Sequence, residues 1–149
     1  MLTTFASRFG GRVELNPEFV VERNTRYYFL NPTVRKIASG NFYYAGLYLG
    51  KVRHKVFFPS FNFLNMLVPV AVNKIFLEKK AAWLFICGRD VFREGILKWV
   101  GSKRNGDYIL VLNEFHECLG FGSVTNRFEE GRVAVRNVFD VGDFLRRES

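Results

Sequence analysis

Side chains suited to catalysis or metal binding are few in this chain, and they are scattered. The 149 residues include two histidines, His54 and His116, each in a polar stretch, and two cysteines, Cys87 and Cys118. A zinc site usually needs four nitrogen or sulfur ligands at short spacings, and neither Cys-x-x-Cys nor His-x3-His occurs. We therefore expect solvent-exposed histidines, two buried thiols in preference to a bridge or a reactive site, and no metal or cofactor.

Acidic pairs and nucleotide motifs give no stronger sign of catalysis. Pairs occur at Glu129-Glu130 and at Glu114 and Glu117, but surface turns supply such pairs routinely, and a carboxylate mechanism needs acids held in a cleft. The frame Gly-x4-Gly-Lys-Ser/Thr of phosphate loops is absent, and no Ser lies in Gly-x-Ser-x-Gly. The sequence therefore predicts a protein that is not an enzyme and has no catalytic residue.

Basic side chains are more abundant, and their distribution is uneven. The net charge is +8, and the whole excess lies in residues 1–80, which hold twelve Lys and Arg against four Glu. Residues 81–149 carry ten basic and ten acidic side chains, so any polyanion bound there must meet a local patch. Candidates for phosphate contacts in that half are Arg89, Lys98, Lys103, Arg104, Arg127, Arg132 and Arg136. The alternative for each is an ordinary solvated or ion-paired residue.

The densest basic run lies in the first half, at Lys51, Arg53, His54 and Lys55, and Phe57-Phe58 follow it. Such a run is usually a solvated face, although an exposed ring beside it would favour base stacking. We expect both phenylalanines in the core. A second alternative is an exposed apolar patch for a protein partner, to which Tyr48, Phe58, Phe61 and Phe63 would contribute.

The elements expected in residues 1–79 form a small mixed α/β unit. Residues 1–9 are too short and too weakly periodic to predict a helix. Asn31 and Pro32 predict the start of a helix that Gly40 ends, and Ser60 predicts the start of a helix over 61–67. Strands are expected at 13–15, 19–21, 26–30, 45–49, 55–58 and 73–77, with a basic loop over 50–55 and a hinge at 78–80.

The elements expected in residues 80–149 are mostly strands. Gly88 and Gly95 are predicted to bound one or two helical turns. A polar loop over 101–107 leads to strand 108–112, whose apolar residues predict that both of its faces are covered. Residues 119–124 return as its hairpin partner, and Gly120-Phe121-Gly122 indicates that another backbone or a ligand comes close.

This order of features resembles the PUA domain, a small RNA-binding β pseudo-barrel. The resemblance rests on the glycine and short helix ending in Gly95-Ile96, the apolar strand, Leu119-Gly120-Phe121-Gly122, and the chain end at 133–147. It implies an α+β chain with an N-terminal α/β domain over 1–79 and a C-terminal PUA domain over 80–149. It also implies that RNA contacts Arg127, Arg132 and Arg136, and that bases meet the backbone near Gly88, Gly95 and Gly120.

The whole order also resembles the Nip-seven family of ribosome-biogenesis factors. The segments that carry this resemblance are Gly46-Leu47-Tyr48-Leu49-Gly50-Lys51, Lys74-Ile75-Phe76-Leu77 and Trp83-Leu84-Phe85. It implies a non-catalytic factor that binds large-subunit rRNA, including U-rich or AU-rich single strands, and protein partners of the pre-ribosome or exosome. Lys51, Arg53 and Lys55 would form a secondary basic patch. The compact length favours an archaeal-type member, and the alternative is a protein-interaction module with little direct RNA binding.

Hydropathy gives expectations about the compartment. Residues 1–11 lack the apolar run of a signal peptide, and the longest apolar stretch, 61–72, is broken by Asn62, Asn65 and Pro69. We therefore expect a monomeric cytoplasmic protein (nucleolar if eukaryotic) that does not contact a membrane.

Overall fold

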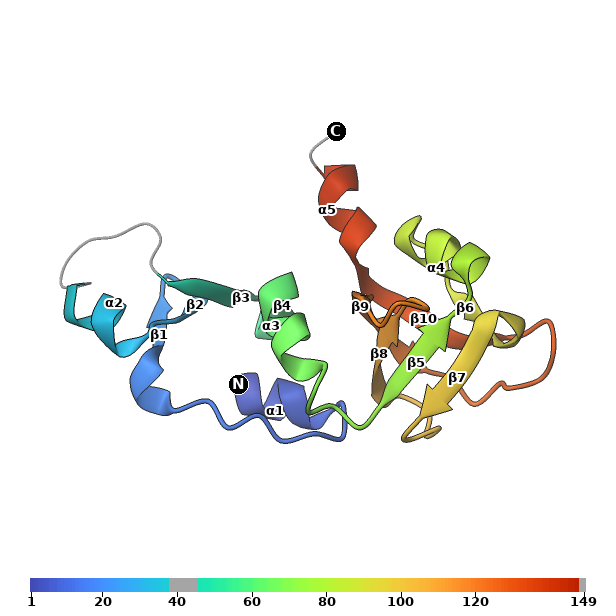
Figure 1. Ribbon diagram of the computed structural model, residues 1–149, viewed down its shortest axis with the longest axis horizontal. Helices are drawn as coiled ribbons and strands as arrows, with labels where there is room; N and C mark the ends of the chain where they lie inside the picture. The colour runs from blue at the N-terminus through green and yellow to red at the C-terminus, as the bar shows by residue number, and fades with distance from the viewer. Residues whose placement is uncertain (38–45, 148–149) are drawn as a thin grey trace.

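The computed structural model describes residues 1–37 and 46–147, which form two β-sheets joined by short helices. The two sheets lie toward opposite ends of the long axis of the molecule (Figure 1). The first has the order β1-β2-β3-β4 and is antiparallel throughout. Its strands are β1 (Val20–Arg23), β2 (Arg26–Phe29), β3 (Leu47–Arg53) and β4 (Val56–Pro59).

The second sheet is a curled half-barrel of six strands, in the order β6-β10-β9-β8-β5-β7. All neighbouring pairs are antiparallel except β5 and β8, which run parallel. The strands are β5 (Lys74–Leu77), β6 (Val91–Phe92), β7 (Ile96–Val100), β8 (Tyr108–Leu112), β9 (Cys118–Val124) and β10 (Val133–Asp140). The predicted α+β class, with a β pseudo-barrel in the second half, is confirmed.

Five α-helices lie within the described residues. They are α1 (Leu2–Ser7), α2 (Pro32–Ile37), α3 (Phe61–Leu67), α4 (Lys79–Ile86) and α5 (Val141–Arg147). The predicted caps are confirmed, because Asn31 Oδ1 accepts from Val34 N at 2.8 Å and Ser60 Oγ accepts from Phe63 N at 3.1 Å. Two 3₁₀ turns lie at Pro17–Phe19 and Arg93–Gly95.

One core cluster connects the two sheets, and α1 supplies its centre. Leu2, Phe5, Ala6 and Phe9 are all buried. They share this cluster with residues of α3, of strands β3 and β4, and of strands β8 and β9. A second cluster lies under α4, where Phe85 packs with residues of β5, β8 and β10. Helix α1 is a correction to the sequence analysis, which predicted no helix in residues 1–9.

The prediction that helical turns begin at Gly88 is wrong, although one turn does end at Gly95. Helix α4 ends before Gly88, whose φ of +87° is the left-handed conformation that follows a helix end. The chain then forms β6 and the 3₁₀ turn Arg93–Gly95. The glycine therefore closes the preceding helix instead of opening a new one.

The basic run also differs from its prediction as a loop. Residues 50–53 belong to β3, and only His54 and Lys55, both at positive φ, form the turn to β4. Phe57 is buried as expected, but Phe58 is 40% exposed, so the prediction of two core phenylalanines is wrong for Phe58. Phe63 is fully buried and takes no part in an exposed patch.

Several expectations lie at the junction of the two halves or outside the described residues. The residues predicted as a hinge, 78–80, cap and begin α4. Strand β5, assigned by the sequence analysis to residues 1–79, pairs in the second sheet. The predicted domain boundary at 79/80 stays a prediction. The helix end at Gly40 and the start of strand 45–49 fall outside the described ranges.

The two cysteines have different environments. Cys118 is partly buried, and this burial raises the pKa of its thiol to about 11, while the thiol lies 3.7 Å from the Gly120 carbonyl oxygen. Cys87 is free and exposed, so the prediction of two buried thiols is wrong for Cys87. Among the described helices, none is long and apolar enough to cross a bilayer.

Candidate nucleic-acid interface

Two loops meet at one end of the six-stranded sheet. The loop 101–107 joins β7 to β8, and the loop 125–132 joins β9 to β10. They are held together where Gly106 N donates to Val124 O at 2.8 Å and Val124 N donates to Asp107 O at 2.9 Å. Successive residues of the first loop, Lys103, Arg104 and Asn105, each line a different surface hollow.

The first hollow, of about 390 Å³, brings together Arg127 and Arg136 from the predicted set. Its lining is completed by Asp90, Asn105, Thr125, Asn126 and Val133. Both arginines are exposed, and within the described residues neither is ion-paired to a carboxylate. Asp90 is already engaged, because its Oδ1 accepts from Asn137 N at 2.9 Å. This Arg127–Arg136 hollow can therefore offer two guanidinium groups to one phosphate or to adjacent phosphates.

Thr125 fixes the backbone from which Arg127 projects. Its buried hydroxyl donates to the Val133 carbonyl oxygen at 2.7 Å and accepts from Arg127 N at 3.1 Å. At the other end of the loop, Gly131 N donates to the Glu94 carboxylate. These bonds fix the backbone of Arg127 before any ligand binds, which lowers the entropy cost of ordering the loop.

Replacing Thr125 by Val is expected to weaken RNA binding by several fold and to destabilise the fold by about 1–3 kcal/mol. The shape of the side chain is kept, but Arg127 N and the Val133 carbonyl lose their shared partner. Urea unfolding and RNA titration on the same preparation measure the two effects. Ser123→Ala, two residues earlier in β9, is the control. An unchanged RNA affinity in Thr125→Val would show that the loop needs no such anchor.

The second hollow, of about 190 Å³, is aromatic and basic. Trp99 and Phe128 pack edge to face with ring centroids 5.5 Å apart. Lys103 Nζ lies 5.8 Å from the centroid of Trp99 and 5.9 Å from that of Phe128. Lys98 lines the same hollow, and its Nζ lies 5.9 Å from the Phe76 centroid. The two predicted lysines thus lie next to rings, an arrangement that serves both cation–π packing and base stacking.

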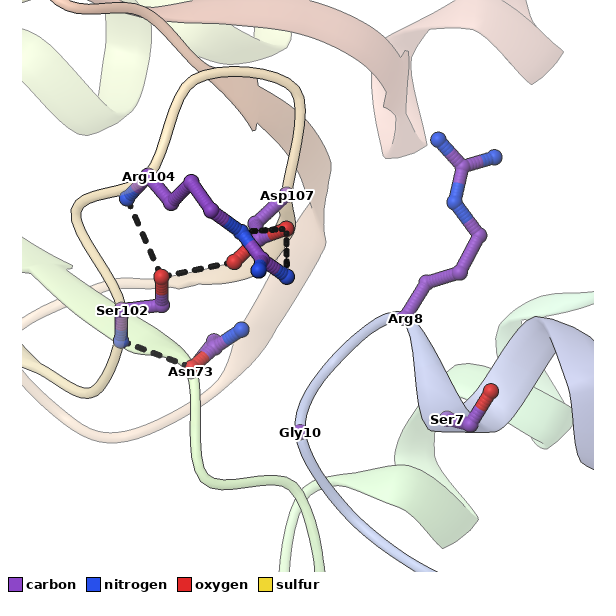
Figure 2. Close-up of a pocket in the computed structure, with 7 residues that line it drawn as sticks. All are labelled: Ser7, Arg8, Gly10, Asn73, Ser102, Arg104 and Asp107. Atoms are coloured by element: carbon purple, nitrogen blue, oxygen red, sulfur yellow. Dashed lines mark hydrogen bonds and ion pairs between the residues drawn. The ribbon is translucent and has the colours of Figure 1, made fainter.

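The third hollow, of about 580 Å³, lies between α1 and the loop 101–107 (Figure 2). Arg104 pairs with Asp107 at 3.1 Å, and Ser102 Oγ donates to Asp107 at 2.6 Å. The hydrogen bond from Ser102, together with the Arg104 guanidinium, holds the pKa of Asp107 below its usual range. Arg8 lies on the other side of the hollow, with its guanidinium carbon 3.3 Å from the Tyr108 centroid.

The remaining predicted residues lie outside the Arg127–Arg136 hollow. Arg132 is exposed in the loop, and Arg89 is exposed beyond α4. Gly95 is buried against the Ala81 side chain. Gly120 is also buried, and a Cβ there would overlap the Phe139 carbonyl oxygen, so the backbone that approaches it is that of β10. Gly88 faces Arg146. Lys51 and Arg53 belong to β3 of the other sheet, and Lys55 lies in the turn that follows β3.

Sequence reasoning missed Trp99, Phe128, Asn126 and Arg8 as lining residues. Trp99 was the most predictable of these residues, because it directly follows Lys98, a basic residue of the predicted set. Phe128 and Arg8 line the hollows because of how the loop 125–132 and the segment after α1 pack in the fold. The residues around them in the sequence do not predict this packing. Across residues 1–37 and 46–147, no three His, Cys, Asp or Glu side chains group as metal ligands.

The curled six-stranded sheet with its parallel β5–β8 pair defines the PUA class of fold. A conserved PUA domain protein from Thermoplasma acidophilum superposes with a TM-score of 0.64 at 20% identity, over 99% of this chain and 91% of that one. A PUA domain from Aeropyrum pernix K1, solved as a tartrate complex, superposes with a TM-score of 0.63 at 19% identity, over 95% of this chain and 82% of that one. At such identities the likeness concerns the fold.

The particular family follows from the sequence. The family model described as the UPF0113 PUA domain matches residues 73–149, and the chain belongs to this family. The UPF0113 protein of Archaeoglobus fulgidus is 27% identical over 118 residues, 75% of this chain and 67% of that protein. The UPF0113 protein of Aeropyrum pernix is 31% identical over 108 residues, which are 70% of this chain and 58% of that protein. The chain thus spans between 58% and 67% of the length of these two relatives.

Proposed function

We propose that this protein is an RNA-binding accessory factor of ribosome biogenesis that carries no catalysis of its own. One observation carries the proposal: Arg127 and Arg136 line one hollow, both exposed and without an ion pair among the described residues. PUA domains suggest RNA binding, and the chain belongs to a PUA family. The hollow lies beside the aromatic pair Trp99 and Phe128, which suits single-stranded or irregular rRNA better than a regular duplex.

The finer assignment follows the resemblance to the Nip-seven family. The expected ligand is large-subunit rRNA, with U-rich or AU-rich single strands as practical probes. Expected partners are proteins of the pre-ribosome or of the exosome, in the cytoplasm of an archaeal-type cell, with this chain as a monomer. The archaeal relatives support the archaeal assignment.

A second candidate is a protein-interaction module with little direct RNA binding. It is favoured by large apolar side chains on the second sheet and α4 that face solvent. Trp83 is 64% exposed and Leu97 is 62% exposed. Such side chains are typical anchors of protein interfaces.

Fluorescence anisotropy with a U-rich single-stranded RNA at two salt concentrations separates the two candidates. Arg127→Ala/Arg136→Ala is expected to weaken binding about 100-fold, because two charge-assisted hydrogen bonds contribute about 1.5 kcal/mol each. The salt slope should fall by about 0.7 for each lost phosphate contact.

The matched control is Arg12→Ala/Arg35→Ala, which removes the same charge from exposed positions in the other half of the chain. It should change affinity less than about threefold, because it removes only long-range attraction. Arg132→Ala tests whether a predicted residue outside the hollow contributes. If the wild-type chain shows no salt-dependent RNA binding, the protein-interaction module replaces the RNA-binding proposal.

A further inference from the structure

One face of the four-stranded sheet carries a row of cations. The strand register places Arg23 opposite Arg26, Arg26 opposite Lys51, and Lys51 opposite Phe58. Directly opposite residues of antiparallel strands project to the same face, as do residues two apart in one strand, so Arg53 joins this set. We call Arg23, Arg26, Lys51, Arg53 and Phe58 the basic face. It lies on the four-stranded sheet, whereas Arg136 of the Arg127–Arg136 hollow belongs to the six-stranded sheet, and the two sheets lie toward opposite ends of the molecule (Figure 1).

The opposite face of this sheet belongs to the core. Tyr27, Val52 and Phe57 pack into the first core cluster, where the Phe57 ring lies 5.2 Å from that of Phe5. Glu22 is the one acidic residue of the four strands, and it lies opposite Tyr27, whose hydroxyl donates to it at 2.8 Å. The strands therefore place their carboxylate on the core side and leave the basic face without one.

Three cations of the basic face lack a carboxylate partner among the described residues. Arg26 and Arg53 are exposed and Lys51 is half-buried, and none of the three forms an ion pair with a carboxylate of the described residues. Like charges directly opposite one another destabilise an antiparallel pair. The Arg26–Lys51 juxtaposition is thus unfavourable in the free protein and becomes favourable when an anion bridges the two side chains.

An exposed ring completes the row. Phe58 on β4 lies directly opposite Lys51 on β3 and is 40% exposed, although the preceding residue, Phe57, is buried. Surfaces that bind single strands combine cations for the phosphates with aromatic rings on which bases stack. An acidic protein segment would match the charges but would leave this ring without a matching planar group.

We propose that the basic face is a second site for single-stranded RNA, with phosphates on Arg26, Lys51 and Arg53 and a base stacked on Phe58. This goes beyond the proposed function, because the face lies on a different sheet and its residues take no part in the Arg127–Arg136 hollow. A strand that reached both surfaces would bind with the added strength of two linked contacts.

The charge part is tested with Arg26→Glu/Lys51→Glu in the full chain, titrated with a fluorescein-labelled U-rich single strand. We expect at least a tenfold loss of affinity and a salt slope shallower by about 0.7 for each lost contact. The control Arg12→Glu/Lys36→Glu makes the same charge change at exposed positions outside the strands of this sheet. An affinity equal to that of the control would overturn the proposal, and circular dichroism checks that each variant is folded.

The stacking part is tested with Phe58→Leu, which keeps an apolar side chain and removes the ring. Stacking on an aromatic contributes about 1–3 kcal/mol per base, so affinity should fall at least about fivefold. Phe115→Leu is the control, because Phe115 is a 76% exposed phenylalanine elsewhere in the chain. Photocrosslinking of 5-iodouridine RNA should label the peptide that contains Phe58, and an unlabelled peptide with unchanged affinity would refute stacking.

The outcomes for the two surfaces are distinguishable. If Arg127→Ala/Arg136→Ala abolishes binding while Arg26→Glu/Lys51→Glu matches its control, the second site fails and the proposed function stands. If Arg26→Glu/Lys51→Glu abolishes binding while Arg127→Ala/Arg136→Ala matches its control, RNA binds on the basic face and the proposal for the Arg127–Arg136 hollow is refuted. If a poly-glutamate peptide displaces RNA from the face as effectively as unlabelled RNA does, the partner is an acidic protein segment.

Discussion

Replacing Phe5 by Ala is expected to lower the free energy of unfolding by about 3–5 kcal/mol, the range for truncating a fully packed Phe. Phe5 is 7% exposed and belongs to α1. Its ring lies within 6.1 Å of five others: Phe9, Phe57, Phe63, Tyr108 and Phe121. Two of them belong to β4 and α3 and two to β8 and β9, so one side chain connects both halves of the core.

Thermal unfolding followed by circular dichroism measures this effect, and the midpoint should fall by about 10 °C. Phe115→Ala is the matched control, because it removes the same ring from a 76% exposed position and should shift the midpoint by less than 2 °C. A small shift for Phe5→Ala would mean that α1 is not packed between the sheets in solution.

Phe5 also shows where sequence reasoning fell short. The buried residues at positions 2, 5 and 6 of α1, and at position 9 just after it, have the spacing of one helix face. Six residues are too few for that spacing to be decisive, and an isolated helix of this length is unstable in water. The helix forms because both sheets bury its apolar side, and that tertiary information is not local.

Elements with local signals were predicted well. Each of the helix starts at Asn31 and Ser60 depends on one capping side chain and the few residues after it. The strand 108–112 depends on an unbroken run of apolar residues. Gly88 was misread because a glycine at a helix boundary marks an end more often than a start. The place of β5 was not predictable either, because its parallel pairing with β8 depends on residues 36 positions apart along the chain (Lys74 and Leu110).

The candidate site was predictable in part. Basic residues near the start of β10 pointed to Arg127 and Arg136, and the structure places both on one hollow. The register of β2 on β3, which aligns Arg26 with Lys51, could not be read from the sequence, because the intervening residues 30–46 give no pairing signal. The sequence thus shows where basic side chains are concentrated, while strand register decides which of them lie side by side.

Replacing Asp140 by Ala is expected to destabilise the protein by about 3 kcal/mol, at the lower end for breaking a buried ion pair because Arg146 is partly solvated. The Asp140 carboxylate is 4% exposed and accepts from Arg146 at 3.0 and 3.1 Å and from Asn137 at 3.0 Å. It also caps α5, since its Oδ1 accepts from Asp143 N at 2.9 Å. Arg146 and Asn137 in turn donate to the Ile86 and Phe85 carbonyls, so the carboxylate joins β10, α4 and α5.

Asp140→Asn separates the two contributions. Asn caps a helix as well as Asp does, but it cannot pair with the Arg146 guanidinium. The midpoint of thermal unfolding should fall by about 6–12 °C in Asp140→Ala and by a smaller amount in Asp140→Asn, with Glu130→Ala unchanged as the control for an exposed acid. Equal losses in both Asp140 variants would assign the whole effect to the ion pair. A loss below 2 °C in Asp140→Ala would show that α5 is not anchored to the barrel through this carboxylate.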